Sequence, residues 1–353
     1  MRQSNTNTQL GIGTLLTAIL GLSLVACDKT DRSFSLLQGQ NTFQQSTSYV
    51  PRKTDILWVV DNSGSMQSSQ DALTTNFSSF IQRFQSLHSD FHMAVTATDA
   101  WRAKYLHNNS LMRWRDGNGG THSGVFVMDM MTPSLSNVFL TNANLGTSGS
   151  GDERAFESFH DSLAYAANSD FVRAGSFLSI IIISDEDDFS STQQYHTADH
   201  DYNSPNLVPI TTYQTYLDGL VGAGNYSVNA ITIMDQACLT QLNASIPGRI
   251  IGQRYMDFAD RTGGVKASLC GDFGNSLQLI SNSIVELSST FTLDRQPAPG
   301  SLNVVVDGVV IPENATNGWT FDSNTLTLSF HGDAVPGQGA AISITFDPLA
   351  PKN

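Results

Sequence analysis

The stretch that decides the fold is Ile56-Leu57-Trp58-Val59-Val60-Asp61-Asn62-Ser63-Gly64-Ser65. It begins with five apolar residues, enough for a strand, and changes without a break to small polar residues around a glycine. A continuous apolar run of this length is typical of a parallel strand that is buried on both faces. Ligand sites of parallel sheets lie in the loops at the carboxyl ends of their strands. Residues 61–65 are therefore a candidate site.

Working outward, apolar runs of strand length alternate with longer segments of helical period from residue 54 onward. This alternation predicts an α/β fold with a doubly wound, mostly parallel sheet covered by helices on both faces. The run 178–183 is the most apolar in the chain and is the predicted centre of the sheet. The other predicted elements are strands at 92–97, near 125–127 and at 226–233, and helices at 68–87, 152–168, 255–261 and 277–287.

The alternation stops near Pro297, Pro299 and Gly300. The segments 302–306, 309–311, 325–330 and 341–346 then show the two-residue period of strands, and turn residues separate them. We therefore expect an α/β domain over 54–294, followed by a small antiparallel all-β domain over 297–353.

Length, composition and charge agree with this division. A chain of 353 residues exceeds the usual size of one hydrophobic core, and 40% hydrophobic with 14% charged residues is a globular composition. The formal charge of -14 comes from 32 acidic and 18 basic residues. Such a surface repels phosphate backbones, so nucleic acid is excluded as an expected partner.

The amino terminus differs from the rest of the chain. Arg2 is the only basic residue before an apolar run over 10–26 that reaches Cys27 through Leu24-Val25-Ala26. This segment resembles a bacterial lipoprotein signal peptide over residues 1–26, which implies cleavage before Cys27 and acylation of that cysteine. More than one acyl chain would make the anchor stable. We expect a cell-envelope protein, lipid-anchored on the periplasmic side of a membrane or at the cell surface.

Residues 27–53 are rich in Gln, Ser and Thr and read as a flexible tether between the lipid and the folded part. Only two cysteines follow, Cys238 and Cys270. In an oxidising exported compartment an even pair predicts a disulfide bond. Neither cysteine has a Cys or His neighbour at the spacing of a zinc site.

Three loops carry the oxygen atoms of the candidate site. Asp61, Ser63 and Ser65 occupy the first, residues 146–151 form a hydroxyl-rich second, and Asp185 opens an acidic third loop after the most apolar strand. Carboxylate and hydroxyl oxygens suit Mg²⁺ or Mn²⁺, and less closely Ca²⁺. The acidic run 186–188 has two readings, a second cation site or a solvated loop.

These residues resemble a von Willebrand factor type A domain. Asp61, Ser63 and Ser65 match its Asp-x-Ser-x-Ser motif, Asp185 matches the aspartate that ends its central strand, and the segment 258–264 is similar to its Ala-x-x-Thr-Gly-Gly segment. The resemblance covers about residues 54–293. It implies a metal-ion-dependent adhesion site in which a carboxylate of a partner protein fills an open coordination position.

The second loop departs from the family, which places a threonine there. Spacing to the following helix puts Ser150 at that position, with Thr147 and Asp152 as alternatives. The expected metal ligands are therefore Asp61, Ser63, Ser65, Ser150 and Asp185.

Two functions remain open at this point. The first is a non-enzymatic lipoprotein that binds a protein partner through the cation, in adhesion or envelope assembly. The alternative is a metal-dependent envelope hydrolase or processing enzyme that uses the cation as a Lewis acid. The recognised motifs contain the cation ligands and no separate general base, which favours binding over turnover.

Overall fold

The computed structural model describes residues 43–48, 52–194 and 204–349. The predicted signal peptide, the lipidation site at Cys27 and the tether before residue 43 lie outside these residues. No helix in the described part of the chain combines the length and the apolar character needed to cross a membrane.

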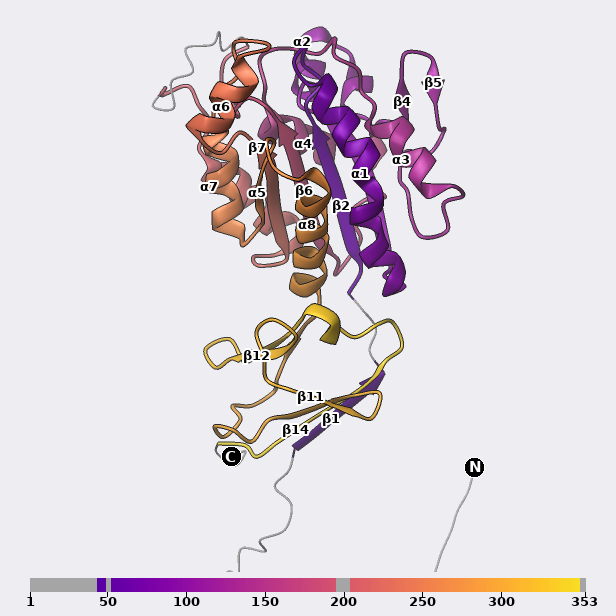
Figure 1. Ribbon diagram of the computed structural model, residues 1–353, viewed down its shortest axis with the longest axis vertical. Coiled ribbons are helices and arrows are strands. Elements are labelled where there is room, and N and C mark those ends of the chain that lie inside the picture. Colours follow the sequence, from indigo (N-terminus) through magenta and orange to yellow (C-terminus); the bar gives the residue numbers. More distant parts are fainter. Residues whose placement is uncertain (1–42, 49–51, 195–203, 350–353) are drawn as a thin grey trace, which may run out of the picture. The chain divides into compact units, whose positions relative to one another are not determined.

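The core of the α/β part is a five-stranded sheet in which every neighbouring pair is parallel (Figure 1). The predicted fold class is confirmed, and the strand expected at the centre lies there. All seven residues of the strand before the candidate site are buried, as are all eight of the central strand. In sheet order the strands are β3 (Phe91–Ala97), β2 (Thr54–Val60), β6 (Phe177–Ser184), β7 (Tyr226–Thr232) and β8 (Lys266–Ser268).

Helices cover both faces of this sheet, because side chains of successive strand residues point to opposite sides. Ile56 and Trp58 pack with α1 (Gln67–Ser86), α3 (Leu135–Ala143) and α8 (Phe273–Ser288). Leu57 and Val59 pack on the opposite face with α4 (Ala155–Ala164), α5 (Ile210–Val221) and α7 (Gln253–Thr262). The short helices α2 (Ala103–Leu106) and α6 (Gln236–Asn243) and the hairpin of β4 (Gly117–Asn118) and β5 (Thr121–His122) lie in connections.

The strand register brings the ends of β3, β2 and β6 level. Val60 pairs with Ala97 on one side and with Ile183 on the other. The ladder continues into the first loop, where the Asp61 amide donates to the Ile183 carbonyl at 2.9 Å. The segments that follow β3, β2 and β6 therefore leave the sheet side by side, and the segment after β2 begins with Asp61.

The carboxyl-terminal residues form two antiparallel sheets, as predicted. They also recruit a strand from the amino-terminal side: β1 (Phe43–Ser48) pairs antiparallel with β14 along its whole length. The assignment of residues 27–53 to a tether is therefore wrong for 43–48. The sheet orders are β1, β14 (Ala341–Phe346), β10 (Asn303–Val306), β11 (Val309–Ile311), and β12 (Gly318–Asp322), β13 (Thr327–His331), β9 (Thr290–Thr292).

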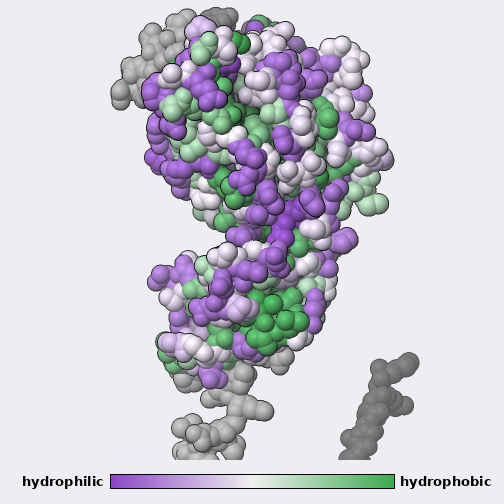
Figure 2. All heavy atoms as spheres, in the orientation of Figure 1, coloured by the Kyte–Doolittle hydropathy of each residue, from purple (hydrophilic) through white to green (hydrophobic). Residues whose placement is uncertain are grey.

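Hydrogen bonds connect this β part to α8 and α1. The Gly332 amide donates to the Glu286 carboxylate at 3.0 Å, and the Gln338 amide donates to the Leu87 carbonyl at 3.2 Å. The edge strand β11 exposes Val309 and Val310, and Figure 2 shows a hydrophobic patch in this region of the surface.

Several local predictions differ from the structure. Residues 125–127 form no strand; the neighbouring Met128 makes one isolated bridge to Met93. The helix expected over 152–168 is shorter, because Arg154 has non-helical backbone angles and α4 begins at Ala155. Helices α3, α5 and α6 and strands β8, β9 and β12 were not predicted, since their short segments carry mixed polar and apolar residues.

Candidate metal site at the carboxyl ends of the central strands

The first loop is folded around the carboxylate of Asp61, which is completely buried. Its Oδ1 accepts a 2.8 Å hydrogen bond from the Ser63 amide, and its Oδ2 accepts a 2.6 Å bond from the Ser184 hydroxyl. The Ser63 and Ser65 hydroxyl oxygens lie 3.3 Å apart. The loop thus gathers one carboxylate and two hydroxyls at the end of β2.

The third loop joins this group directly. The Ser65 hydroxyl donates to Asp185 Oδ1 at 2.9 Å, across 120 residues of sequence. The other oxygen, Asp185 Oδ2, accepts a 2.5 Å bond from Nε of Arg249 in a buried ion pair. The structure therefore brings together the four residues that the sequence indicated, Asp61, Ser63, Ser65 and Asp185. Arg249 is an additional neighbour that no sequence motif predicted.

Arg249 fastens the site to the loop after α6. Its Nη1 donates to the Leu242 and Ile246 carbonyls, and its Nη2 donates to the Ser65 carbonyl at 3.1 Å. The Nε bond of Arg249 thus occupies Oδ2 of Asp185, and Oδ1 is left to accept the bond from the Ser65 hydroxyl. The guanidinium also offsets part of the negative charge of the buried acids.

Helix α1 ties the first loop to the second. Nε2 of Gln70 donates to the Asp61 carbonyl at 2.8 Å and to the Gly146 carbonyl at 2.9 Å. A further bond joins the Gly149 amide to the Asn62 carbonyl at 2.8 Å. All three loops predicted from the sequence are therefore held together at this end of the sheet.

The electrostatics of the cluster favour a cation. Burial, followed by repulsion from Asp185, raises the pKa of Asp61 to about 7, although hydrogen bonds from Ser184 and Ser63 act in the opposite direction. Burial and repulsion from Asp61 and Asp185 raise the pKa of Glu186 to about 8. Arg249 compensates only part of the negative charge here, and a nearby positive ion would supply the rest.

The second-loop candidates have other hydrogen bonds. The Ser150 hydroxyl accepts a 3.1 Å bond from the Asp152 amide, and within the described chain it makes no hydrogen bond to the four converging residues. Asp152 forms a 2.7 Å ion pair with Arg154. Thr147 is half-buried in the same loop.

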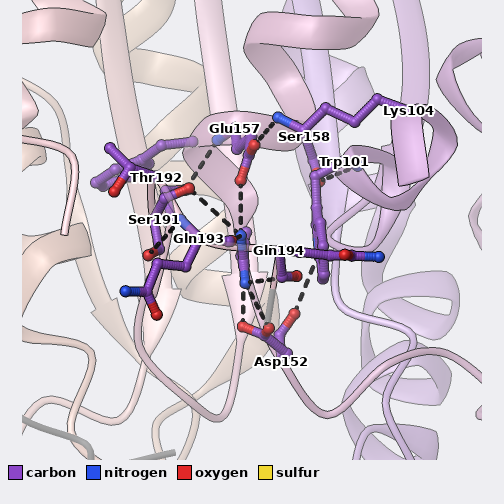
Figure 3. Close-up of polar contacts among 12 residues, drawn as sticks. Trp101, Lys104, Asp152, Glu157, Ser158, Ser191, Thr192, Gln193 and Gln194 are labelled. Carbon is purple, nitrogen blue, oxygen red and sulfur yellow. Dashed lines mark hydrogen bonds and ion pairs between the residues drawn. The ribbon is translucent and has the colours of Figure 1, made fainter. Parts of the chain in front are cut away.

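The guanidinium of Arg154 draws together residues of the second loop, α4 and the third loop. Figure 3 labels several of its partners, among them Asp152, Glu157 and Gln193. It contacts the carboxylates of Asp152 and Glu157, donates to the carbonyls of residues 191, 193 and 194, and lies 3.9 Å from the Trp101 ring centre. A fully buried arginine with this many partners has a structural role, because it locks the entry to α4 against the third loop.

Glu153 is the residue that sequence reasoning missed. Its side chain is completely buried, and neither carboxylate oxygen has a hydrogen-bond partner among the described residues. Burial and repulsion from Asp61 raise the pKa of Glu153 well above its usual range, although the nearby Thr98 hydroxyl acts in the opposite direction. Its position between the hydroxyl-rich loop and α4 could have marked Glu153 as a candidate site residue. An acid at that position, however, does not fit the motif of the family that the sequence resembles.

The acidic run of the third loop turns inward rather than forming a solvated loop. Asp188 Oδ1 accepts the Phe156 amide at 2.9 Å near the start of α4, and Asp187 accepts the Arg254 amide at 2.9 Å near the start of α7. Arg254 also pairs with Asp188 at 3.1 Å. Carboxylates at helix amino termini satisfy unpaired amides and the helix dipole. Asp187 and Asp188 therefore support the loops.

The Thr-Gly-Gly segment also has a packing role. The Thr262 hydroxyl accepts the Val228 amide at 2.9 Å, and Gly263 ends α7 with a left-handed φ of 66°. A Cβ on Gly264 would lie 1.9 Å from the Val228 carbonyl oxygen. Val228 lies near the start of β7, so this segment is remote from the converging loops along that strand.

Cys238 and Cys270 form the predicted disulfide, with their Cα atoms 5.6 Å apart. The bond links α6 to the loop before α8 and encloses the segment that carries Arg249.

Taken together, two aspartates and two serine hydroxyls present hard oxygen donors of the kind that bind Mg²⁺, Mn²⁺ or Ca²⁺. Among the residues that the structure describes, no three His, Cys, Asp or Glu side chains are grouped closely enough to hold a metal by themselves. A cation bound here would therefore depend on the hydroxyls of Ser63 and Ser65 as well as on the two aspartates.

Comparisons with known proteins show low similarity. No protein-family model matches the sequence, and no curated protein matches it. The pilus adhesin SpaC from Lactobacillus rhamnosus GG, in an open conformation, is 10% identical, with a TM-score of 0.42 over 86% of this chain and 40% of that chain. Another crystal form gives 12% identity and a TM-score of 0.39 over the same shares.

Proximal thread matrix protein 1 from the mussel byssus is 10% identical, with a TM-score of 0.38 over 72% of this chain and 52% of that chain. The chain thus spans about half or less of these structures.

Proposed function

We propose that this chain is a von Willebrand factor type A protein that binds a protein partner through a divalent cation held by Asp61, Ser63, Ser65 and Asp185. The observation that carries the proposal is the hydrogen-bonded convergence of these residues, which come from two separate loops at the carboxyl end of a parallel sheet. The Asp-x-Ser-x-Ser sequence and the hard oxygen donors support the same site.

The cation would be Mg²⁺, with Mn²⁺ and Ca²⁺ as alternatives. Serine hydroxyls donate little negative charge, so an ion held by them stays electrophilic and attracts an anionic oxygen to its open position. A carboxylate on the partner protein is the matching group. We propose binding rather than turnover, in adhesion or assembly at the cell envelope, with the lipid at Cys27 holding the protein to a membrane.

Calorimetric titration with MgCl₂ and MnCl₂ tests the cation. Wild-type protein should bind one ion, and Asp61→Asn together with Asp185→Asn should abolish binding, because both aspartate charges are then removed from the site. Asp71→Asn is the matched control, since Asp71 is an exposed acid on the neighbouring helix α1. Absence of cation binding by the wild type would overturn the proposal.

A second experiment tests whether the partner supplies a carboxylate to the cation. Proteins are captured from envelope extract on the immobilised protein, in the presence of Mg²⁺ or of EDTA. Capture should need the cation, should be lost in the double variant and should be competed by a soluble carboxylate such as acetate. Capture that persists in EDTA, or that the double variant retains, would contradict a metal-bridged contact.

A further inference from the structure

Glu153 carries a buried carboxylate next to the candidate cation site. Its carboxylate is completely buried and neither oxygen is hydrogen-bonded among the described residues. A buried charge without a partner is strongly unfavourable, and folded proteins normally pair such a group or bring it to a metal. A positive group that pairs with this carboxylate is therefore expected.

No Lys or Arg side chain in the described part of the chain pairs with this carboxylate. The side chain of the adjacent Arg154 is hydrogen-bonded to Asp152, Glu157 and three carbonyls. The ionisable groups that act most strongly on Glu153 are themselves acids, first Asp61 and then Glu186. The charges of these acids repel it.

Backbone hydrogen bonds hold Glu153 beside Asp61. The Thr98 amide donates to the Val60 carbonyl at 3.2 Å, immediately before Asp61, and the Arg154 amide donates to the Thr98 carbonyl at 3.4 Å. On the other side, the Phe189 amide of the third loop donates to the Glu153 carbonyl at 2.8 Å. The residue is thus fixed between the end of β2 and the third loop.

We propose that Glu153 is the second-loop ligand of the cation, a carboxylate in the position where the family resemblance led us to expect a hydroxyl from Ser150. The inference rests on the cation site proposed above. Asp61, Asp185 and Glu153 are not grouped closely enough in the described chain to hold a metal as they stand, so binding requires the Glu153 side chain to turn toward an ion beside Asp61. Neither of its oxygens has a hydrogen bond of normal geometry to hold it back, and among the described residues only the Thr98 hydroxyl lies near enough to stabilise its charge.

The charges of the buried groups fit this assignment. When ionised, Asp61, Asp185 and Glu153 carry three negative charges, and Arg249 carries one positive charge; all four residues are buried. A divalent cation beside them would stabilise the ionised form of the acids, including Glu153, which pairs with no Lys or Arg side chain in the described chain. Ligand charge also tunes affinity at oxygen sites, so a third carboxylate makes binding tighter.

Glu153→Gln and Glu153→Thr test the inference by calorimetric titration with CaCl₂ and with MgCl₂. Gln keeps the shape and loses the charge, whereas Thr restores the hydroxyl of the family motif. Both variants should bind at least about 10-fold more weakly than wild type, in line with the loss seen when groups supporting a metal site are removed. Glu313→Gln, at an exposed acid in the β part, should leave affinity unchanged.

Thermal unfolding separates a ligand from a structural residue. In EDTA, Glu153→Gln should be as stable as wild type or more stable, because it removes an acid whose ionisation is unfavourable in this buried position. The rise in Tm on adding Ca²⁺ should shrink. A lower Tm in EDTA would make Glu153 structural and overturn the inference.

Wild-type affinity in Glu153→Gln or Glu153→Thr would also overturn it. If Asp61→Asn abolishes binding and the Glu153 variants keep it, the proposed function stands and Glu153 is removed from the site. If the wild type binds neither ion, both proposals fail.

Discussion

Removal of the disulfide should lower the free energy of unfolding by a measurable amount. The size of this loss follows from the length of the loop that the disulfide closes. Cys238 and Cys270 are 32 residues apart. The chain-entropy relation for a loop of this length gives a loss of about 3.7 kcal/mol at room temperature, because the unfolded chain regains freedom that the cross-link denied it. With a urea m-value of about 3 kcal/mol/M, the unfolding midpoint falls by about 1.2 M.

Equilibrium urea unfolding of Cys238→Ala/Cys270→Ala against wild type measures this loss. Alanine is chosen because Cys238 is buried and a serine hydroxyl would add an unpaired polar group. Wild type unfolded in excess reductant is the control, since it opens the same loop without changing side-chain volume. Equal midpoints for oxidised and reduced wild type would refute the reasoning, and a changed m-value would show that the two unfolded states differ in compactness.

Three further substitutions probe the site and the frame that carries it. Arg249→Met should destabilise the protein by about 3–5 kcal/mol in EDTA, because Asp185 keeps a buried charge without its partner. In thermal unfolding, saturating Mg²⁺ should recover part of this loss. An equal loss with and without Mg²⁺ would show that the cation does not bind Asp185. Gly264→Ala should cost about 1–3 kcal/mol or more in urea unfolding, because its Cβ would lie 1.9 Å from a carbonyl oxygen of β7. Gly219→Ala, in α5 with no atom within 4 Å of the added Cβ, should instead raise stability by about 0.5–1 kcal/mol, since alanine restricts the unfolded chain; a loss there as large as at Gly264 would mean that the close contact is not the cause.

Local sequence determined the frame because its signals are strong and repeated. The apolar run ending at Val60 and the run over 178–183 are long enough to be strands buried on both faces, and they are neighbours in the sheet. Asp61, Ser63 and Ser65 follow the first run directly, and Asp185 follows the second. A parallel sheet brings such loops to one edge, so the convergence of these four residues followed from the pattern.

Tertiary structure alone decided the rest. Phe43–Ser48 pairs with a strand about 300 residues later, and a polar segment of six residues carries no sign of so distant a partner. The sequence gives no reason for Arg249 to reach Asp185, since the pair is separated by 64 residues and depends on how the loop after α6 folds back. Glu153 is an ordinary acid in the sequence, and only packing between β2 and the third loop buries it without a partner. Hydrophobic period specifies which residues enter a core, whereas the neighbours of a buried charge are set by loop paths that no local pattern encodes.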